Sequence, residues 1–158
     1  MEFEDTQFLG LTIVKFFKSA DNRGVFVKPW LNCSLKDKFG NVDEAYFSFS
    51  KKGVFRGLHY QTGDKAQQKY VVCLTGCVED IAVDLRVDQP TYGQVFRKRL
   101  NAMDGEGLIV PAGFAHGIYA HEPSTIVNFC DKPYAPGSEL GINCYSLKEI
   151  SELDIREI

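Results

Sequence analysis

The sequence predicts an all-β fold, a sandwich or barrel of short antiparallel strands. Two observations support this prediction: the apolar runs are short, and turn-forming glycine, proline, asparagine or aspartate residues separate most of them. The runs occupy residues 10–17, 24–31, 45–50, 53–61, 69–74, 77–87, 94–100, 107–111, 116–120 and 125–130. Such a series of short strands is typical of sandwiches and barrels.

The run at 77–87 shows the alternation expected of a strand. Its odd positions from Ile81 to Val87 are apolar, whereas the even positions include Asp80 and Asp84. A period of two places these sets on opposite faces of a sheet. The charged face meets either solvent or a polar cavity inside the barrel, and the pattern leaves both open.

Only two segments look helical, and both are short. One covers residues 33–40, "CSLKDKFG". The other covers residues 146–158, where Leu147, Ile150, Leu153 and Ile158 recur near helical spacing. The expected architecture is therefore a strand-built barrel with short peripheral helices.

Length and charge narrow the class of protein. The 158 residues suffice for one domain, predicted over residues 1–158, and the net charge of −3 without a basic stripe argues against a nucleic-acid partner. No apolar stretch is long enough for a membrane helix, and no secretion signal is apparent at the start. Five cysteines, an odd number without paired spacing, favour reduced thiols and a cytoplasmic location.

Two motifs share the spacing of the two cupin signatures. In residues 105–116, "GEGLIVPAGFAH", Pro111, Gly113 and His116 match the second signature. In the first, His59 keeps its place, but Gln61 and Lys69 stand where metal-ligating histidine and glutamate belong. The chain thus resembles a cupin, whose fold is a jelly roll.

These substitutions change the predicted chemistry. Glutamine is a poor ligand for a divalent metal, and the charge of a protonated Lys69 repels a cation. We therefore expect no catalytic metal. A neutral histidine beside an ammonium suits removal of a proton next to a ketone, with the cation stabilising the enolate oxygen.

The strand at 53–61 raises a geometric question. Strict alternation places Arg56 and His59 on opposite faces of the sheet. A bulge or bend at Gly57 brings them to one face. The sequence leaves this choice open.

Six segments together resemble the dTDP-4-dehydrorhamnose 3,5-epimerases and related nucleotide-sugar epimerases, a branch of the cupins. These segments are residues 21–26, 48–61, 66–72, 78–94, 109–117 and 134–142. The resemblance implies a cofactor-free jelly-roll homodimer. It also implies a substrate in which a 4-keto-6-deoxyhexose is attached to a nucleoside diphosphate, with a histidine as base and a tyrosine as acid.

The resemblance assigns roles to individual positions. The implied catalytic residues are His59 as the base, Lys69 as the enolate-stabilising cation, and Asp84. The implied substrate-binding residues are Arg56 and His116 in the active site, Arg23 at the diphosphate and Phe26 on the nucleotide side.

The sequence also departs from the family. Asn128 stands where the acid tyrosine is expected, so we assign Asn128 to substrate binding and expect Tyr134, Tyr119 or water to donate the proton. The aspartate that pairs with the base has no apparent counterpart, and Asp84 or Asp80 is expected to replace it. Glu44 and Tyr46 replace a glutamine and an asparagine that the family carries on the nucleotide side, which suggests a different nucleotide or sugar.

The expected function is epimerisation of a nucleotide-linked 4-keto-6-deoxy sugar at C3, or at both C3 and C5. A 3,4-ketoisomerase is an alternative, although Gln61 argues against it. A non-catalytic cupin that binds sugar nucleotides and, more remotely, a metal dioxygenase are further alternatives.

Overall fold

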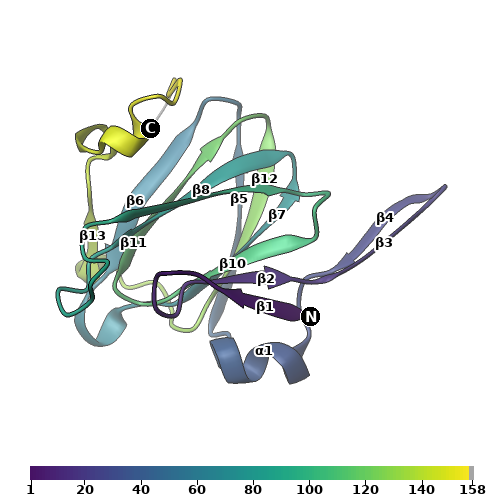
Figure 1. Ribbon diagram of the computed structural model, residues 1–158, viewed down its shortest axis with the longest axis horizontal. Coiled ribbons are helices and arrows are strands. Elements are labelled where there is room, and N and C mark those ends of the chain that lie inside the picture. Colours follow the sequence, from purple (N-terminus) through teal and green to yellow (C-terminus); the bar gives the residue numbers. More distant parts are fainter. Residues whose placement is uncertain (157–158) are drawn as a thin grey trace.

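The computed structural model describes residues 1–156, which form two antiparallel sheets facing each other (Figure 1). The six-stranded sheet has the order β1 (Glu2–Asp5), β2 (Thr12–Lys15), β10 (Glu106–Val110), β7 (Lys69–Thr75), β12 (Ser124–Cys130) and β5 (Glu44–Ser50). The five-stranded sheet has the order β13 (Glu139–Gly141), β6 (Phe55–Gln61), β11 (Phe114–Ala120), β8 (Cys77–Asp84) and β9 (Val95–Asn101). The predicted all-β jelly roll is confirmed.

The space between the sheets is apolar at one end. Buried side chains from both sheets pack together there, among them Val71, Leu108 and Phe114. Full burial of each stabilises the fold by about 1.5–3 kcal/mol relative to exposure. The other end, between β5 and β12 on one side and β6 and β11 on the other, is lined by polar side chains and stays open.

The outer face of the six-stranded sheet is covered by α1 (Asn32–Phe39), which confirms the helix predicted at 33–40. Leu35 and Phe39 of this helix are buried against Tyr70 and Val72 of β7. Val71 and Cys73, the alternating residues of β7, belong to the inner core. Because successive side chains of a strand point to opposite faces, the continuous apolar run of β7 is buried on both faces of the sheet.

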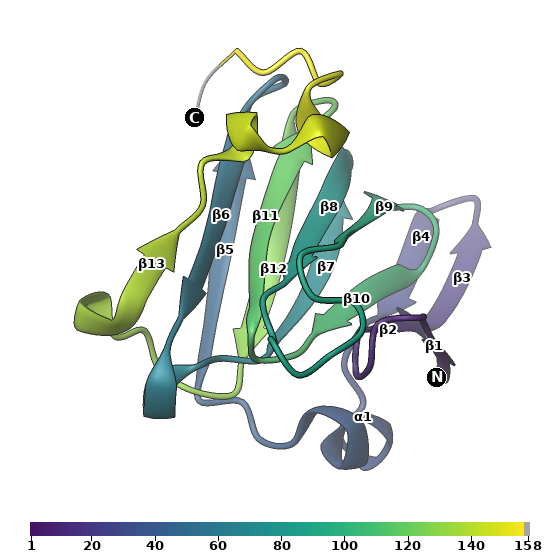
Figure 2. The same cartoon turned by 60° about the vertical axis from the view of Figure 1, so that its left-hand side comes forward.

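The helix predicted at 146–158 is wrong. Residues 144–156 form two 3₁₀ turns, Cys144–Ser146 and Lys148–Ile150, and are otherwise without regular structure (Figure 2). Leu147, Ile150 and Leu153 are three residues apart, a spacing that fits three residues per turn as well as an α-helix. They pack with Leu58 and Ile81 on the five-stranded sheet, so tertiary burial sets the local conformation. Residues 157–158, including Ile158, lie outside the described part.

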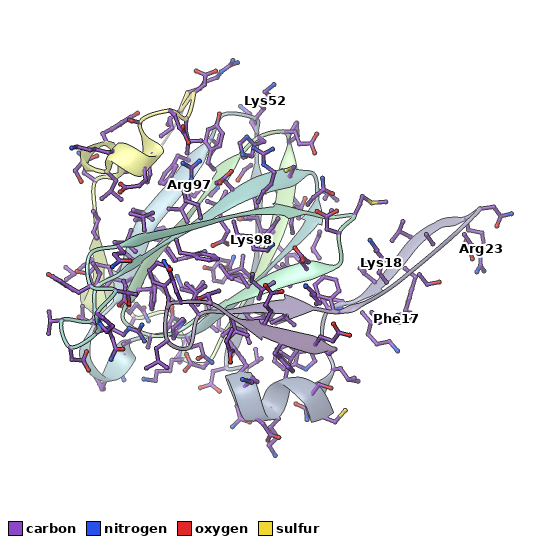
Figure 3. The ribbon with its side chains drawn as sticks, in the orientation of Figure 1. Phe17, Lys18, Arg23, Lys52, Arg97 and Lys98 are labelled. Carbon is purple, nitrogen blue, oxygen red and sulfur yellow. The ribbon has the colours of Figure 1, made fainter. Side chains whose placement is uncertain are left out.

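A hairpin of β3 (Phe17–Asp21) and β4 (Gly24–Lys28) extends from the body as a separate two-stranded sheet (Figure 3). Phe17 and Phe26 stack edge to face on it, and both are more than half exposed. At the tip, the guanidinium of Arg23 donates hydrogen bonds to Asp21. Within residues 1–156, no helix has the length and apolar character needed to cross a membrane.

Candidate active site

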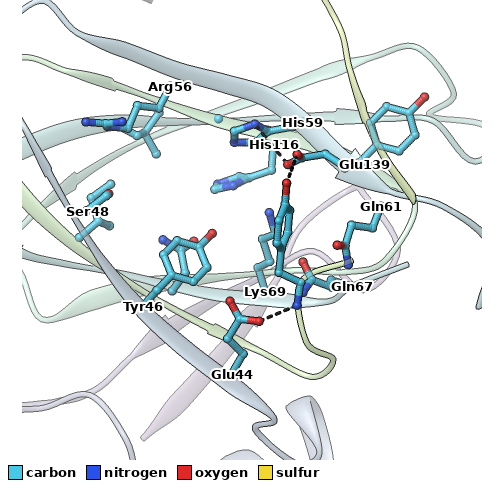
Figure 4. A pocket seen from close by; sticks show the side chains of 16 residues that line it. Glu44, Tyr46, Ser48, Arg56, His59, Gln61, Gln67, Lys69, His116 and Glu139 are labelled. Atoms are coloured by element: carbon cyan, nitrogen blue, oxygen red, sulfur yellow. Dashed lines mark hydrogen bonds and ion pairs between the residues drawn. The ribbon is translucent and has the colours of Figure 1, made fainter. Parts of the chain in front are cut away.

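A cavity of about 350 Å³ occupies the polar end of the space between the sheets (Figure 4). Strands of both sheets contribute to its walls, so groups from opposite sides face a shared interior. The lining side chains with polar or charged groups are Glu44, Tyr46, Ser48, Arg56, His59, Tyr60, Gln61, Gln67, Lys69, His116, Asn128, Tyr134 and Glu139.

The wall formed by the five-stranded sheet depends on an irregularity in β6. The pairing of β6 with β11 shifts register between His59 and Arg56, and Gly57 between them has a φ of 120°. Both Arg56 and His59 consequently line the cavity, which resolves the question left open by the sequence. A Cβ at Gly57 would lie 2.6 Å from the Cα of Gly117, so glycine permits close approach of the strands.

The surroundings of His59 favour a neutral imidazole. Its imidazole is 47% exposed, with Nδ1 3.8 Å from Oε1 of Glu139. Burial lowers the pKa of His59, the charge of Lys69 lowers it further, and Glu139 acts in the opposite direction. The lowered pKa favours the neutral ring near pH 7, which is the form that accepts a proton.

His116 lies directly across the β6–β11 pair from His59. Its Nε2 is 2.9 Å from Oδ1 of Asp80, a fully buried carboxylate on β8. Of the two acids predicted on one face of this strand, Asp80 is therefore the one that contacts a cavity residue. It fixes the orientation of His116 in the cavity wall.

The wall formed by the six-stranded sheet carries the cation. Lys69, at the start of β7, extends into the cavity in Figure 4. Burial lowers the pKa of Lys69, while Glu139, Asp80 and Glu44 counteract this effect. These groups favour an ammonium that can donate hydrogen bonds to an oxygen in the cavity.

The same wall includes β5 and β12. In β5 the alternate residues Glu44, Tyr46 and Ser48 face the cavity, whereas Phe47 and Phe49 point outward and are exposed. On β12, Oδ1 of Asn128 is buried and accepts no hydrogen bond from any group in residues 1–156. A buried acceptor without a donor is costly, and a bound ligand can supply the donor.

Gln61 is held by hydrogen bonds to the backbone. The Gln61 amide donates to the carbonyl of Lys65 and accepts a hydrogen bond from the backbone of Ala135, which commits it to the backbone. Over residues 1–156, no three His, Cys, Asp or Glu side chains gather as a metal site requires.

The geometry thus brings the imidazole of His59 and the amine of Lys69 to one cavity from opposite sheets. A family model for dTDP-4-dehydrorhamnose 3,5-epimerase matches residues 5–150. The chain belongs to this family. A relative of that name from Sinorhizobium fredii is 33% identical over 147 residues, which span 90% of this chain and 75% of the relative.

Solved structures of the epimerase family share the fold. The dTDP-6-deoxy-D-glucose-3,5-epimerase of Legionella pneumophila, in complex with dTDP-4-keto-L-rhamnose, is 32% identical with a TM-score of 0.84, covering 99% of this chain and 82% of its own. A 3'-monoepimerase of Streptomyces bikiniensis, in complex with dTDP-quinovose, is 25% identical with a TM-score of 0.88, covering 98% and 81%. Proteins similar to this chain therefore include one described as a 3,5-epimerase and one described as a 3'-monoepimerase.

Most of the predicted site residues line the cavity. They are His59, Lys69, Tyr134, Arg56, His116 and Asn128. Tyr134 is half exposed, and its hydroxyl donates a 2.7 Å hydrogen bond to Glu139. Tyr119 is buried on the other side of the sheet, where its hydroxyl donates to the carbonyl of Asp154.

Asp84 requires a correction, because it lies outside the cavity lining. Its carboxylate is fully buried and accepts hydrogen bonds from the guanidinium of Arg86 and, at 2.6 Å, from the hydroxyl of Thr91. Alternation correctly places Asp84 on the same face as Asp80. Asp84, however, ends β8 four positions further along the strand, beyond the reach of His59.

Arg23 and Phe26 also lie outside the cavity lining of the single chain, because both belong to the projecting hairpin (Figure 3). Sequence reasoning named Tyr46 only as a replacement on the nucleotide side and gave it no role in the cavity, and it missed Glu139 altogether. The alternation of residues 44–50 could have placed Tyr46 beside Glu44. Glu139 gave no such signal, since it reaches His59 only through the three-residue strand β13.

Proposed function

We propose that this protein epimerises a nucleoside-diphosphate-linked 4-keto-6-deoxy sugar at C3, or at both C3 and C5, without a cofactor. One observation carries the proposal: His59 and Lys69 face a common cavity from opposite sheets. The relative and the two solved structures named above support the same substrate class, by their names and bound ligands.

The proposed reaction begins at the carbon next to the keto group. The 4-keto group acidifies the C3 and C5 protons, and neutral His59 removes one of them. The electron pair moves to the carbonyl oxygen, where the Lys69 ammonium stabilises the developing enolate. Return of a proton to the opposite face of the same carbon completes the inversion.

We further propose that two copies of the chain act together. The hairpin of one copy would bring Arg23 and Phe26 to the diphosphate and base of the nucleotide in the other. The exposed aromatic rings on the hairpin and the outward Phe47 and Phe49 of β5 support such pairing, since buried apolar area drives association. We also propose that residues 1–158 form one catalytic domain that works in the cytoplasm. Its five free cysteines support this location, because thiols stay reduced there.

A mixing experiment tests the exchange of hairpins. Arg23→Ala and His59→Asn variants, each inactive alone, should regain up to about a quarter of wild-type activity when their subunits are mixed. In a mixed dimer, one cavity receives both an intact His59 and an intact Arg23. Analytical ultracentrifugation should show a dimer. A monomer, or a mixture that remains inactive after subunit exchange, would contradict this part of the proposal.

The reaction itself is tested by proton NMR in deuterated water with dTDP-linked 4-keto-6-deoxyglucose. Deuterium at C3 with an inverted product indicates a 3-epimerase, and deuterium at C3 and C5 indicates double epimerisation. A product in which the keto group has moved to C3 would instead identify the 3,4-ketoisomerase. Binding without exchange would identify a non-catalytic sugar-nucleotide protein, and it would overturn the proposal.

A further inference from the structure

We propose that Tyr46 is the acid that returns the proton during epimerisation. This inference rests on the proposed function, because it names the partner of His59 in that reaction. Inversion requires the donor to approach the carbon from the side opposite to the base. The position of a phenol relative to the two sheets therefore decides whether it can act.

Tyr46 meets this geometric requirement. His59 belongs to β6 of the five-stranded sheet, whereas Tyr46 belongs to β5 of the six-stranded sheet, and both line the cavity. Figure 4 shows the phenol of Tyr46 extending into the cavity from the wall that also carries Lys69. A sugar ring between the sheets would present one face to His59 and the other to Tyr46.

The hydroxyl of Tyr46 is free to donate. Within residues 1–156, it donates no hydrogen bond to another protein group, in contrast to the hydroxyls of Tyr70, Tyr119 and Tyr134. Burial raises the pKa of Tyr46, and the nearby acids add to this effect. The phenol therefore keeps its proton at neutral pH and is available as a general acid.

Asn128 provides independent evidence that a ligand binds beside this phenol. It is the direct cross-strand partner of Tyr46 in the β12–β5 pair, which places the two side chains about 5 Å apart at their Cβ atoms. Its buried Oδ1 lacks a donor in the described chain. Tyr46 does not donate to it, so a substrate hydroxyl can supply that hydrogen bond. The two residue types of this pair are also exchanged relative to the family that the sequence resembles. Asn128 stands where the acid tyrosine is expected, and Tyr46 stands where an asparagine is expected.

Tyr134 is less suitable, although it also lines the cavity. Its hydroxyl donates to Oε2 of Glu139, whose other oxygen lies 3.8 Å from Nδ1 of His59. Glu139 belongs to β13, which pairs with β6. Tyr134 is thus engaged on the side of the base, whereas inversion needs a donor on the opposite side.

The proton balance is closed by water. His59 takes the proton from the carbon, the C–H electron pair forms the enolate, and the O–H bond of Tyr46 breaks as a new C–H bond forms. The enolate collapses to the ketone, which leaves a phenolate and an imidazolium. Solvent then protonates the phenolate and removes the extra proton from His59, whose ring is 47% exposed.

The test separates exchange from inversion. Tyr46→Phe and wild type are incubated with dTDP-linked 4-keto-6-deoxyglucose in deuterated water and followed by NMR. We expect the variant to lose about 10²- to 10⁴-fold in formation of the inverted product. It should still place deuterium in the recovered substrate, with unchanged configuration, at a rate within about tenfold of wild type, because His59 can return a solvent deuteron to the face it attacks.

Two further variants complete the experiment. Tyr92→Phe, an exposed tyrosine remote from the cavity, should invert the sugar at the wild-type rate. Tyr134→Phe should reduce inversion less than Tyr46→Phe. Either of two outcomes overturns this inference but not the proposed function. In the first, Tyr46→Phe inverts the sugar at the wild-type rate. In the second, only Tyr134→Phe loses inversion while it keeps the exchange of deuterium. A wild-type protein that catalyses no exchange overturns both.

Discussion

Glu139 and His59 lie on the neighbouring strands β13 and β6 of the cavity wall, with Oε1 of the carboxylate 3.8 Å from Nδ1 of the imidazole. The distance is too long for a direct hydrogen bond, so the interaction is mainly electrostatic. The carboxylate also holds the hydroxyl of Tyr134, which fixes its own position. Glu139 can therefore orient the base and stabilise the imidazolium that forms when His59 takes a proton.

This relationship predicts the pH profile of Glu139→Gln. Glu139 raises the pKa of His59 against the larger lowering effects of burial and Lys69. Removing the negative charge should lower that pKa further, so the acidic limb of kcat/KM shifts to lower pH. The weaker, less oriented base should reduce kcat by roughly tenfold. Steady-state kinetics across pH measure both effects, with Glu149→Gln, outside the cavity, as control. An acidic limb at higher pH would contradict the role given to Glu139.

Replacement of Lys69 should shift the same limb in the opposite direction. The charge of Lys69 lowers the pKa of His59, so Lys69→Met should raise it and move the acidic limb to higher pH. Loss of the donor to the enolate oxygen should also lower kcat by about 10²- to 10³-fold. Lys65→Met, a matched substitution in the exposed turn beyond β6, should leave both unchanged. A normal kcat in Lys69→Met would exclude it as the enolate partner.

The sequence predicts the main walls of this site because its strands follow a period of two. That rule correctly places Asp80 and Asp84 on one face, and the cupin-like spacing brings His59 near Lys69 and His116. These predictions need only local periodicity and a recognised motif. They do not need the order of strands in the sheets.

The remaining features depend on which strands become neighbours. Tyr46 matters because β5 pairs with β12, and Glu139 matters because β13 pairs with β6. Neither pairing is visible in a local pattern. The wrong helix at 146–158 has a similar cause, since burial of Leu147 and Ile150 on the five-stranded sheet determines their conformation.

Gly57 is predicted to be indispensable for the bulge that presents both Arg56 and His59. In Gly57→Ala, the new methyl group would lie 2.6 Å from the Cα of Gly117, at a φ of 120° that side chains rarely adopt. We expect a loss of about 2–4 kcal/mol in the free energy of unfolding. Gly63→Ala provides the matched control: its φ is also positive, but no atom lies within 4 Å, so only about 1–2 kcal/mol should be lost. Urea denaturation measures both values. Equal losses would show that strand approach at Gly57 is not limiting.

Asp84 should affect stability rather than catalysis. Burial raises the pKa of Asp84, but hydrogen bonds from Arg86 and Thr91, with the charge of Arg86, prevail and leave it below the usual value of 3.8. A carboxyl with a lowered folded-state pKa stabilises the protein above its unfolded pKa, and this contribution is lost as pH falls through the folded value. Asp84→Asn leaves Arg86 without its buried partner and should cost about 3–5 kcal/mol.

The contrast with the wild type should be largest at neutral pH. It should shrink as pH falls below about 4, where the carboxyl of the unfolded chain takes up a proton, and through the lower folded-state pKa. Asp88→Asn, an exposed neighbour, should change stability by less than about 0.5 kcal/mol at any pH. Folded Asp84→Asn should keep a kcat within about threefold of wild type, because the carboxylate does not line the cavity. Denaturation curves and kinetics on the same samples separate the two effects. A folded variant with a kcat reduced 100-fold would restore Asp84 to the catalytic set, through a route that its hydrogen bonds do not reveal.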